Sequence, residues 1–182
     1  RAIPEGGPER EQRLRKAVEL SESLVNEYPI VSEYRALLFG NLRSLGFMLF
    51  YTQRENEAEE NLRRAIQEIG TLARHSPENH SYRSQQQRTQ LLLSRLWFET
   101  GKPVEAREVL EHVISEQNRS LEANSQQHRL RWGVIRMYER LSEMLAAEGK
   151  SEEAAHANEQ AELHRQALPE DWQGRRRGFR FR

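Results

Sequence analysis

Apolar residues recur along this chain at intervals of three and four, in stretches separated by glycine, proline or short polar runs. That spacing is typical of amphipathic helices. In the first stretch, Ala17, Val18, Leu24 and Val25 follow one helical stripe, and Pro29 ends it because proline disfavours helix in the preceding residue. The pattern predicts seven helices, over about residues 8–28, 31–51, 55–75, 77–100, 103–121, 125–148 and 151–168.

Residues with capping chemistry mark several of the predicted helix ends. Ser76 and Ser151 are expected N-caps, because a serine side chain accepts a hydrogen bond from a free backbone N–H of the first turn. Pro77 and Pro103 suit the first turn that follows. Gly101 is expected to end the fourth helix in the left-handed conformation, which glycine adopts without steric cost.

The same classes of residue return every 48 positions. Ala58, Ala106 and Ala154 lie at this interval, and Pro29 returns as Pro77. Such a period predicts an array of helix pairs, with a half repeat followed by three full repeats. The interval also links Leu45 with Leu93 and Leu141, Gly46 with Ser94 and Ser142, and Ala17 with Ala65, Val113 and Ala161.

Close packing explains these repeated positions. A small residue after a leucine lets the first helix of a pair approach the second, and an alanine twelve residues later receives that approach. Helical bundles in general contain leucine and alanine at such spacings. Four classes of position that share one interval favour a true repeat.

The arrangement resembles the tetratricopeptide repeat (TPR), whose motif places leucine and a small residue on the first helix and alanines on the second. Gln90 and Asn158 depart from the motif, and the period exceeds the usual ~34 residues, so longer helices are expected. The matching sets are Leu42, Leu45, Gly46, Leu49, Ala58, Leu62 and Ala65; then Leu93, Ser94, Trp97, Ala106, Leu110 and Val113; then Tyr138, Leu141, Ser142, Leu145, Ala154 and Ala161.

The resemblance covers residues 10–168 and implies an all-α fold, a right-handed α-solenoid of antiparallel helix pairs. We expect a flexible lead-in over 1–8, and a repeat region over 9–168 made of a half repeat (9–28) and repeats at about 29–76, 77–124 and 125–168. A basic tail without fixed structure is expected over 169–182. The long period and the segments 27–29 and 33–35 are similar to TPR arrays of planctomycete bacteria, which often follow serine/threonine kinase domains.

TPR arrays bind extended peptides or helices in a groove lined by their first helices, so the resemblance implies a protein-interaction scaffold. Arginines among aromatic residues suit a ligand with carboxylates and apolar anchors. The alternative is that Phe47, Phe50 and Phe98 are core residues and the arginines form a solvated face. The predicted groove residues are Arg43, Phe47, Phe50, Tyr51, Arg88, Leu91, Arg95, Phe98, Arg136, Glu139 and Glu143.

Arginine alternates with glycine and phenylalanine near the C-terminus. This chemistry can stack on nucleic-acid bases and neutralise phosphates, or bind anionic lipid. The alternative, which we favour, is a disordered terminus whose charge aids solubility. The residues concerned are Arg175, Arg176, Arg177, Phe179 and Arg180.

Composition and motif content bear on three classes of function: nucleic-acid binding, metal binding and catalysis. Lysine plus arginine and aspartate plus glutamate both number 28, so no overall charge attracts nucleic acid, and an apolar content of 36% suits a thin array. The chain has no cysteine, and its six histidines lack helical metal-ligand spacing. With no nucleophile elbow, phosphate-binding loop or paired catalytic acids, we predict a non-enzyme with no catalytic, cofactor or metal site.

The longest apolar run, 45–51, is far too short to span a membrane. Because the sequence begins at Arg1 rather than methionine, we expect it to be part of a longer protein, and the resemblance implies a bacterial one. Its location would be cytoplasmic by default, and extracytoplasmic if a membrane segment precedes it. The expected partner is a protein or peptide rather than nucleic acid. Two alternatives stay open, a regulatory or sensory domain of a signalling kinase and a nucleic-acid-associated adaptor that uses the basic tail.

Overall fold

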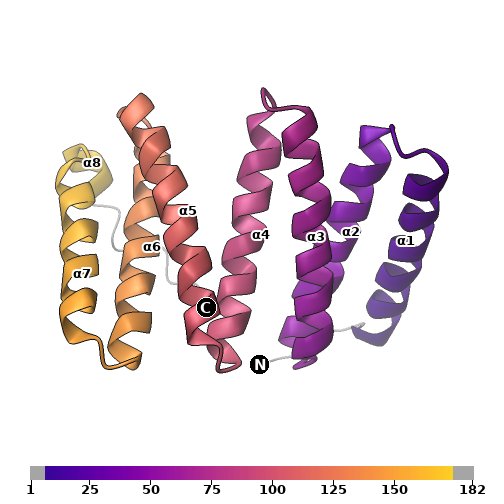
Figure 1. Ribbon diagram of the computed structural model, residues 1–182, viewed down its shortest axis with the longest axis horizontal. Coiled ribbons are helices and arrows are strands. Elements are labelled where there is room, and N and C mark those ends of the chain that lie inside the picture. Colours follow the sequence, from indigo (N-terminus) through magenta and orange to yellow (C-terminus); the bar gives the residue numbers. More distant parts are fainter. Residues whose placement is uncertain (1–6, 174–182) are drawn as a thin grey trace. The chain divides into compact units, whose positions relative to one another are not determined.

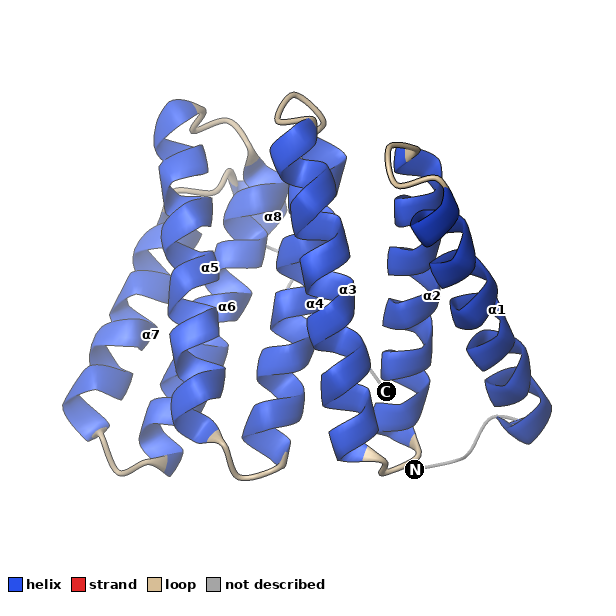
Figure 2. Ribbon diagram, turned by 45° about the vertical axis from the view of Figure 1, so that its right-hand side comes forward, coloured by secondary structure: helices blue, strands red, loops and turns tan. Residues whose placement is uncertain are grey.

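The computed structural model describes residues 7–173, and every regular element in that range is a helix (Figures 1 and 2). The all-α prediction is confirmed. The helices fall into two compact units, an N-terminal unit that ends at Lys102 and a C-terminal unit that begins at Pro103. The N-terminal unit holds α1 (Gly7–Glu27), α2 (Ser32–Tyr51), α3 (Glu55–His75) and α4 (His80–Glu99), and the C-terminal unit holds α5 (Pro103–Ala123), α6 (His128–Ala147), α7 (Ser151–Gln166) and α8 (Glu170–Gln173).

The helix bounds follow the 48-residue period of the sequence. The first helices of the three pairs, α2, α4 and α6, have 20 residues each and begin 48 positions apart. The second helices, α3, α5 and α7, also begin 48 positions apart. The 48-residue period therefore applies to the positions of the helices as well as to the residue types.

One turn geometry joins the two helices of each pair. The residue that ends the turn donates its backbone N–H to a carbonyl five residues earlier, and the residue before it has positive φ, which together define a Schellman C-cap. The positive-φ residue is Gly101 (φ 79°) or Gly149 (φ 77°) in two pairs, but Gln53 (φ 62°) in the other. The bonds are Arg54 to Leu49 at 3.0 Å, Lys102 to Trp97 at 2.8 Å and Lys150 to Leu145 at 2.9 Å.

The predicted close approach at the small residues is confirmed in both units. A Cβ added at Gly46 would lie 2.9 Å from Cγ of Leu62 and 3.2 Å from the carbonyl oxygen of Ala58. At the equivalent place in the C-terminal unit, the Ser142 hydroxyl donates to the carbonyl oxygen of Ala154 at 2.8 Å. Helices α2 and α6 thus contact the backbone of their partners, α3 and α7, twelve residues later in the sequence.

The fourth and sixth helices begin later than the sequence suggested. Helix α4 begins at His80, with the Asn79 side chain accepting from the Ser81 N–H at 3.2 Å, and Pro77 lies in the preceding turn. The prediction of Ser76 as its N-cap is wrong, because Ser76 ends α3 and donates its N–H to the Leu72 carbonyl at 3.0 Å. Helix α6 likewise begins at His128 rather than at residue 125.

The C-terminal unit ends in a short helix that the sequence did not suggest. Helix α8 lies within the span assigned to the tail, and Trp172 packs against a buried cluster that contains Ile135, Ala161 and Leu168. The Trp172 ring lies 5.8 Å from the ring of His128, centroid to centroid. This contact covers apolar surface at the end of the repeats, as capping elements of repeat proteins do.

Candidate binding surface

In the N-terminal unit, the two first helices form one layer. Helices α2 and α4 contact each other, and ion pairs join α1 to α3 in the other layer. The predicted groove residues of the first two repeats all lie on α2 and α4. The structure therefore places them on the layer that the TPR resemblance implied.

Four of the predicted residues meet in one group with Glu99, which we call the Tyr51–Arg95 cluster: Phe47, Phe50, Tyr51, Arg95 and Glu99. The Phe47 and Tyr51 rings lie 4.6 Å apart, and the Phe50 and Tyr51 rings 5.4 Å apart, between centroids. From α4, the Arg95 Nη1 donates to the Tyr51 hydroxyl at 3.3 Å, and its Cζ lies 5.5 Å from the Phe50 ring centroid. Aromatic surface from α2 and a cation from α4 are thus combined.

The Arg95 guanidinium is positioned from two sides. Its Nε donates to the Glu99 carboxylate at 2.8 Å, and that carboxylate raises the pKa of Arg95. The side chain remains 45% exposed, and its Nη2 makes no hydrogen bond to a described residue. A held, charged guanidinium with one open edge suits a carboxylate or a backbone carbonyl of a ligand.

The other predicted residues of this layer differ in exposure. Phe50 is only 2% exposed, which agrees with the core alternative, and its ring contacts Tyr51 and Arg95. Phe47 is 45% exposed and available for contact. Arg88 is exposed, whereas Arg43, Leu91 and Phe98 are half-buried.

In the C-terminal unit, the predicted groove residues on α6 already have partners within the chain. Arg136 lies 3.3 Å from Glu139, and Glu139 also accepts from Arg165 of α7 at 2.7 Å. Glu143 accepts from Arg140 at 3.0 Å. A ligand would have to compete with these arginines, so we expect a smaller contribution from this trio than from the Tyr51–Arg95 cluster.

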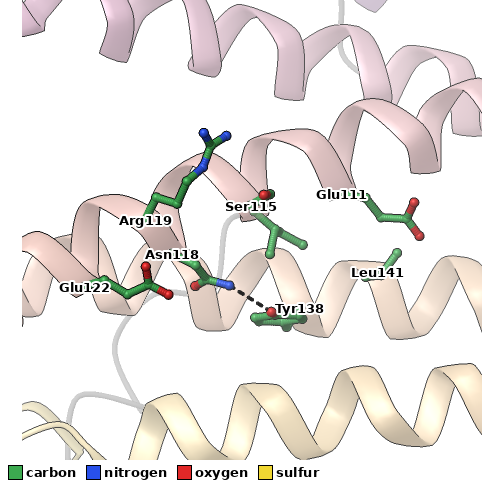
Figure 3. Close-up of a pocket in the computed structure, with 8 residues that line it drawn as sticks. Glu111, Ser115, Asn118, Arg119, Glu122, Tyr138 and Leu141 are labelled. Carbon is green, nitrogen blue, oxygen red and sulfur yellow. Dashed lines mark hydrogen bonds between the residues drawn. The ribbon is translucent and has the colours of Figure 1, made fainter.

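A feature that the sequence did not reveal lies among α5, α6 and α7. Two hollows of about 360 Å³ and 620 Å³ share Glu111, Tyr138 and Leu141 in their linings. Figure 3 shows the smaller one, with the Asn118 amide of α5 donating to the Tyr138 hydroxyl at 3.0 Å. The sequence signal for these hollows is a change of charge between positions two repeats apart, such as Arg15 and Glu111.

The remaining predictions concern the tail, metal binding and the membrane. Arg175, Arg176, Arg177, Phe179 and Arg180 lie outside the described residues. Within residues 7–173, no three histidine or acidic side chains group as metal ligands would, and no helix combines the length and apolarity needed to cross a membrane.

Comparison with known proteins gives a fold. No family model and no curated protein matches the chain. Among solved structures, it is similar to TPR-like repeats of a Podosopora anserina kinesin light chain, at 22% identity over 85% of this chain and 68% of that one, with a TM-score of 0.56. It also matches MamA at 16% identity over 91% and 97% of the two chains, but with a TM-score of only 0.35. The fold is therefore TPR-like.

Proposed function

We propose that this chain is a protein-interaction scaffold that binds a peptide or partner helix across α2 and α4. The observation that supports the proposal best is the Tyr51–Arg95 cluster, in which residues from two first helices combine an exposed aromatic edge with a held cation. Aromatic residues and arginine are also the side chains that most often dominate binding energy at protein interfaces. The TPR-like fold supports the same general role.

The cluster favours a ligand of definite chemistry. Because Glu99 accepts the hydrogen bond from Arg95 Nε, a ligand carboxylate can accept one from Arg95 Nη2 without displacing that contact. Phe47, packed on Tyr51, offers apolar area next to it. The expected ligand therefore carries an acidic residue, or a chain terminus, close to an apolar anchor.

Peptide selection on the intact chain tests the proposal. Peptides selected for binding from a random displayed library should be enriched in an acidic residue near an apolar one, and Arg95→Glu should lower their affinity by about tenfold or more. Phe47→Ala should also weaken binding. Leu20→Ala, an exposed residue of α1 that is 54% accessible, is the matched control and should have no effect.

Equal affinity for wild type, Arg95→Glu and Phe47→Ala, with helicity preserved by circular dichroism, would rule out the α2–α4 surface. Preference for basic peptides at this surface would also count against the assignment.

A further inference from the structure

The three helices α5, α6 and α7 leave an open groove over α6. The larger hollow is lined by residues of α5 and α7, and its floor on α6 includes Tyr138, Leu141 and Leu145 (Figure 3 shows the adjoining smaller hollow). Such a groove calls for a comparison with the same three-helix group in the N-terminal unit, α1, α2 and α3, which lies two repeats earlier.

In the N-terminal unit, arginine–glutamate pairs join the two outer helices over α2. Arg15 of α1 and Glu57 of α3 lie 2.7 Å apart. Two further pairs, Glu11 with Arg54 and Glu22 with Arg64, join the start of α3 and its middle to α1. These ion pairs join α1 to α3 at three places along the two helices.

None of the three pairs survives two repeats later, at positions shifted by 96 residues. The Arg15–Glu57 pair becomes Glu111 and Glu153, two anions. The other two become a pair of cations and a pair of neutral amides, and neither can form an ion pair. The replaced positions are Arg107 with Lys150 and Asn118 with Gln160.

The remaining charges near the groove are mostly carboxylates. Three glutamates, Glu111, Glu152 and Glu153, line the larger hollow, and no lysine or arginine does so among the described residues. Arg107 lies nearby, 3.3 Å from Glu111 and 3.6 Å from Glu148. The other charged groups facing the two hollows are Arg119 and Glu122 in the smaller hollow, and His156, whose ring lies 3.6 Å from Glu159.

The floor of the groove has an aromatic residue, Tyr138, at the position where the N-terminal unit has a leucine. Tyr138 stands where α2 has Leu42, which is fully buried. The Asn118 amide holds the Tyr138 hydroxyl, and the Tyr138 ring stacks on His164 at 5.7 Å between centroids. A fixed aromatic ring between acidic walls is a favourable place for a guanidinium or an apolar side chain.

We propose that this groove binds a basic segment of a partner protein, whose lysine or arginine side chain bridges Glu111 and Glu153 and so supplies the cation that Arg15 supplies in the N-terminal unit. An apolar residue next to that cation packs on Tyr138 and Leu141. Charge complementarity fixes the class of occupant, because three carboxylates line the larger hollow, and Arg107 is the described cation that contacts one of them. The groove lies in the C-terminal unit and does not depend on the α2–α4 surface.

The probe is a labelled peptide of about twelve residues in which arginine alternates with leucine and phenylalanine, compared with the same peptide carrying glutamate for arginine. The full chain should bind the basic peptide and not the acidic one, with weaker binding at about 0.5 M salt because the charges are screened. Glu111→Arg should lower the affinity by about tenfold or more, since it places a cation opposite Glu153 as in the N-terminal unit.

Glu108→Arg is the matched control, because it makes the same charge change on an exposed residue of α5 that does not line the groove. It should change the affinity by less than about twofold. Should Glu111→Arg fail to fold, Glu111→Gln removes the charge with little change of shape and should still weaken binding. Arg95→Gln should leave this probe unaffected, which separates the inference from the proposed function.

Equal losses for Glu111→Arg and Glu108→Arg would show attraction to net charge alone and overturn the proposal. A chain ending at Gln173 that binds the peptide several-fold more tightly than the full chain would also overturn it, by assigning the groove to the chain's own basic tail. Equal affinity of the truncated and full chains supports a partner segment.

Discussion

Gln53 occupies a backbone conformation that glycine adopts at the equivalent positions of the other two turns. Its φ is 62°, against 79° for Gly101 and 77° for Gly149, and its side chain is exposed with no hydrogen bond to a described residue. Replacement by glycine therefore removes no side-chain hydrogen bond to a described residue. The change isolates the preference of the backbone.

The size of the effect follows from two opposing terms. A residue with a Cβ in the left-handed region costs about 1–2 kcal/mol. Glycine loses more conformational entropy on folding, which costs about 0.5–1 kcal/mol. We expect Gln53→Gly to raise the free energy of unfolding by about 0.5–1 kcal/mol, which corresponds to a few degrees in the thermal midpoint.

Urea denaturation followed by circular dichroism and by tryptophan fluorescence measures the change, with Trp97 in the N-terminal unit and Trp132 and Trp172 in the C-terminal unit. Gly149→Gln is the reciprocal control, because an added Cβ there meets no atom within 4 Å and only the backbone is strained. It should lower stability by about 1 kcal/mol. A Gln53→Gly protein with unchanged or lower stability, while the reciprocal variant behaves as expected, would refute this account of the turn.

Three further predictions follow from the packing and from a half-buried histidine. Gly46→Ala should destabilise the N-terminal unit by about 1–3 kcal/mol because its Cβ would clash with Leu62, whereas Gly40→Ala, with open space around the added Cβ, should stabilise α2 by up to about 1 kcal/mol in the same urea assay. Ser142→Ala should lower the free energy of unfolding by about 1 kcal/mol through loss of the bond to the Ala154 carbonyl, and an unchanged urea midpoint would contradict that bond. Burial, together with the Arg131 guanidinium, lowers the pKa of His164 below its ordinary value of 6.5, so the folded chain binds that proton less readily than the unfolded chain. Its contribution to stability is present above about pH 6.5 and is lost as the pH falls toward the lowered pKa; His164→Gln should flatten the pH dependence of unfolding between about pH 7 and pH 5, and an unaltered dependence would contradict the assignment.

The scaffold was predictable because its signals are local and repeated. The interval that joins Ala58, Ala106 and Ala154 also spaces the helices, and Gly101 ends α4 as its chemistry suggested. The start of α4 was misjudged because Ser76 and Pro77 imitate a cap. The 48-residue period gives the start of α4 correctly from that of α2, since α2 begins at Ser32 and α4 begins 48 residues later.

The surfaces were harder to predict because they depend on side chains that meet across helices. Sequence spacing placed Arg95 on a first helix, but it could not show that Arg95 lies over the Phe50 ring or that Phe47 packs on Tyr51. The groove over α6 lies where the residues of α5 and α7 differ from the ion-paired residues of α1 and α3. The replacement of Arg15 by Glu111 two repeats later can be interpreted only once the contact between Arg15 and Glu57 is known.

Amide hydrogen exchange tests whether α2 and α4 form a ligand-binding surface. With a selected acidic–apolar peptide bound, the account predicts slower exchange near the C-terminal ends of α2 and α4, around Tyr51 and Arg95, and no comparable change for the Arg95→Glu protein. Protection confined to α1 and α3, or equal protection of the wild type and the variant, would contradict it.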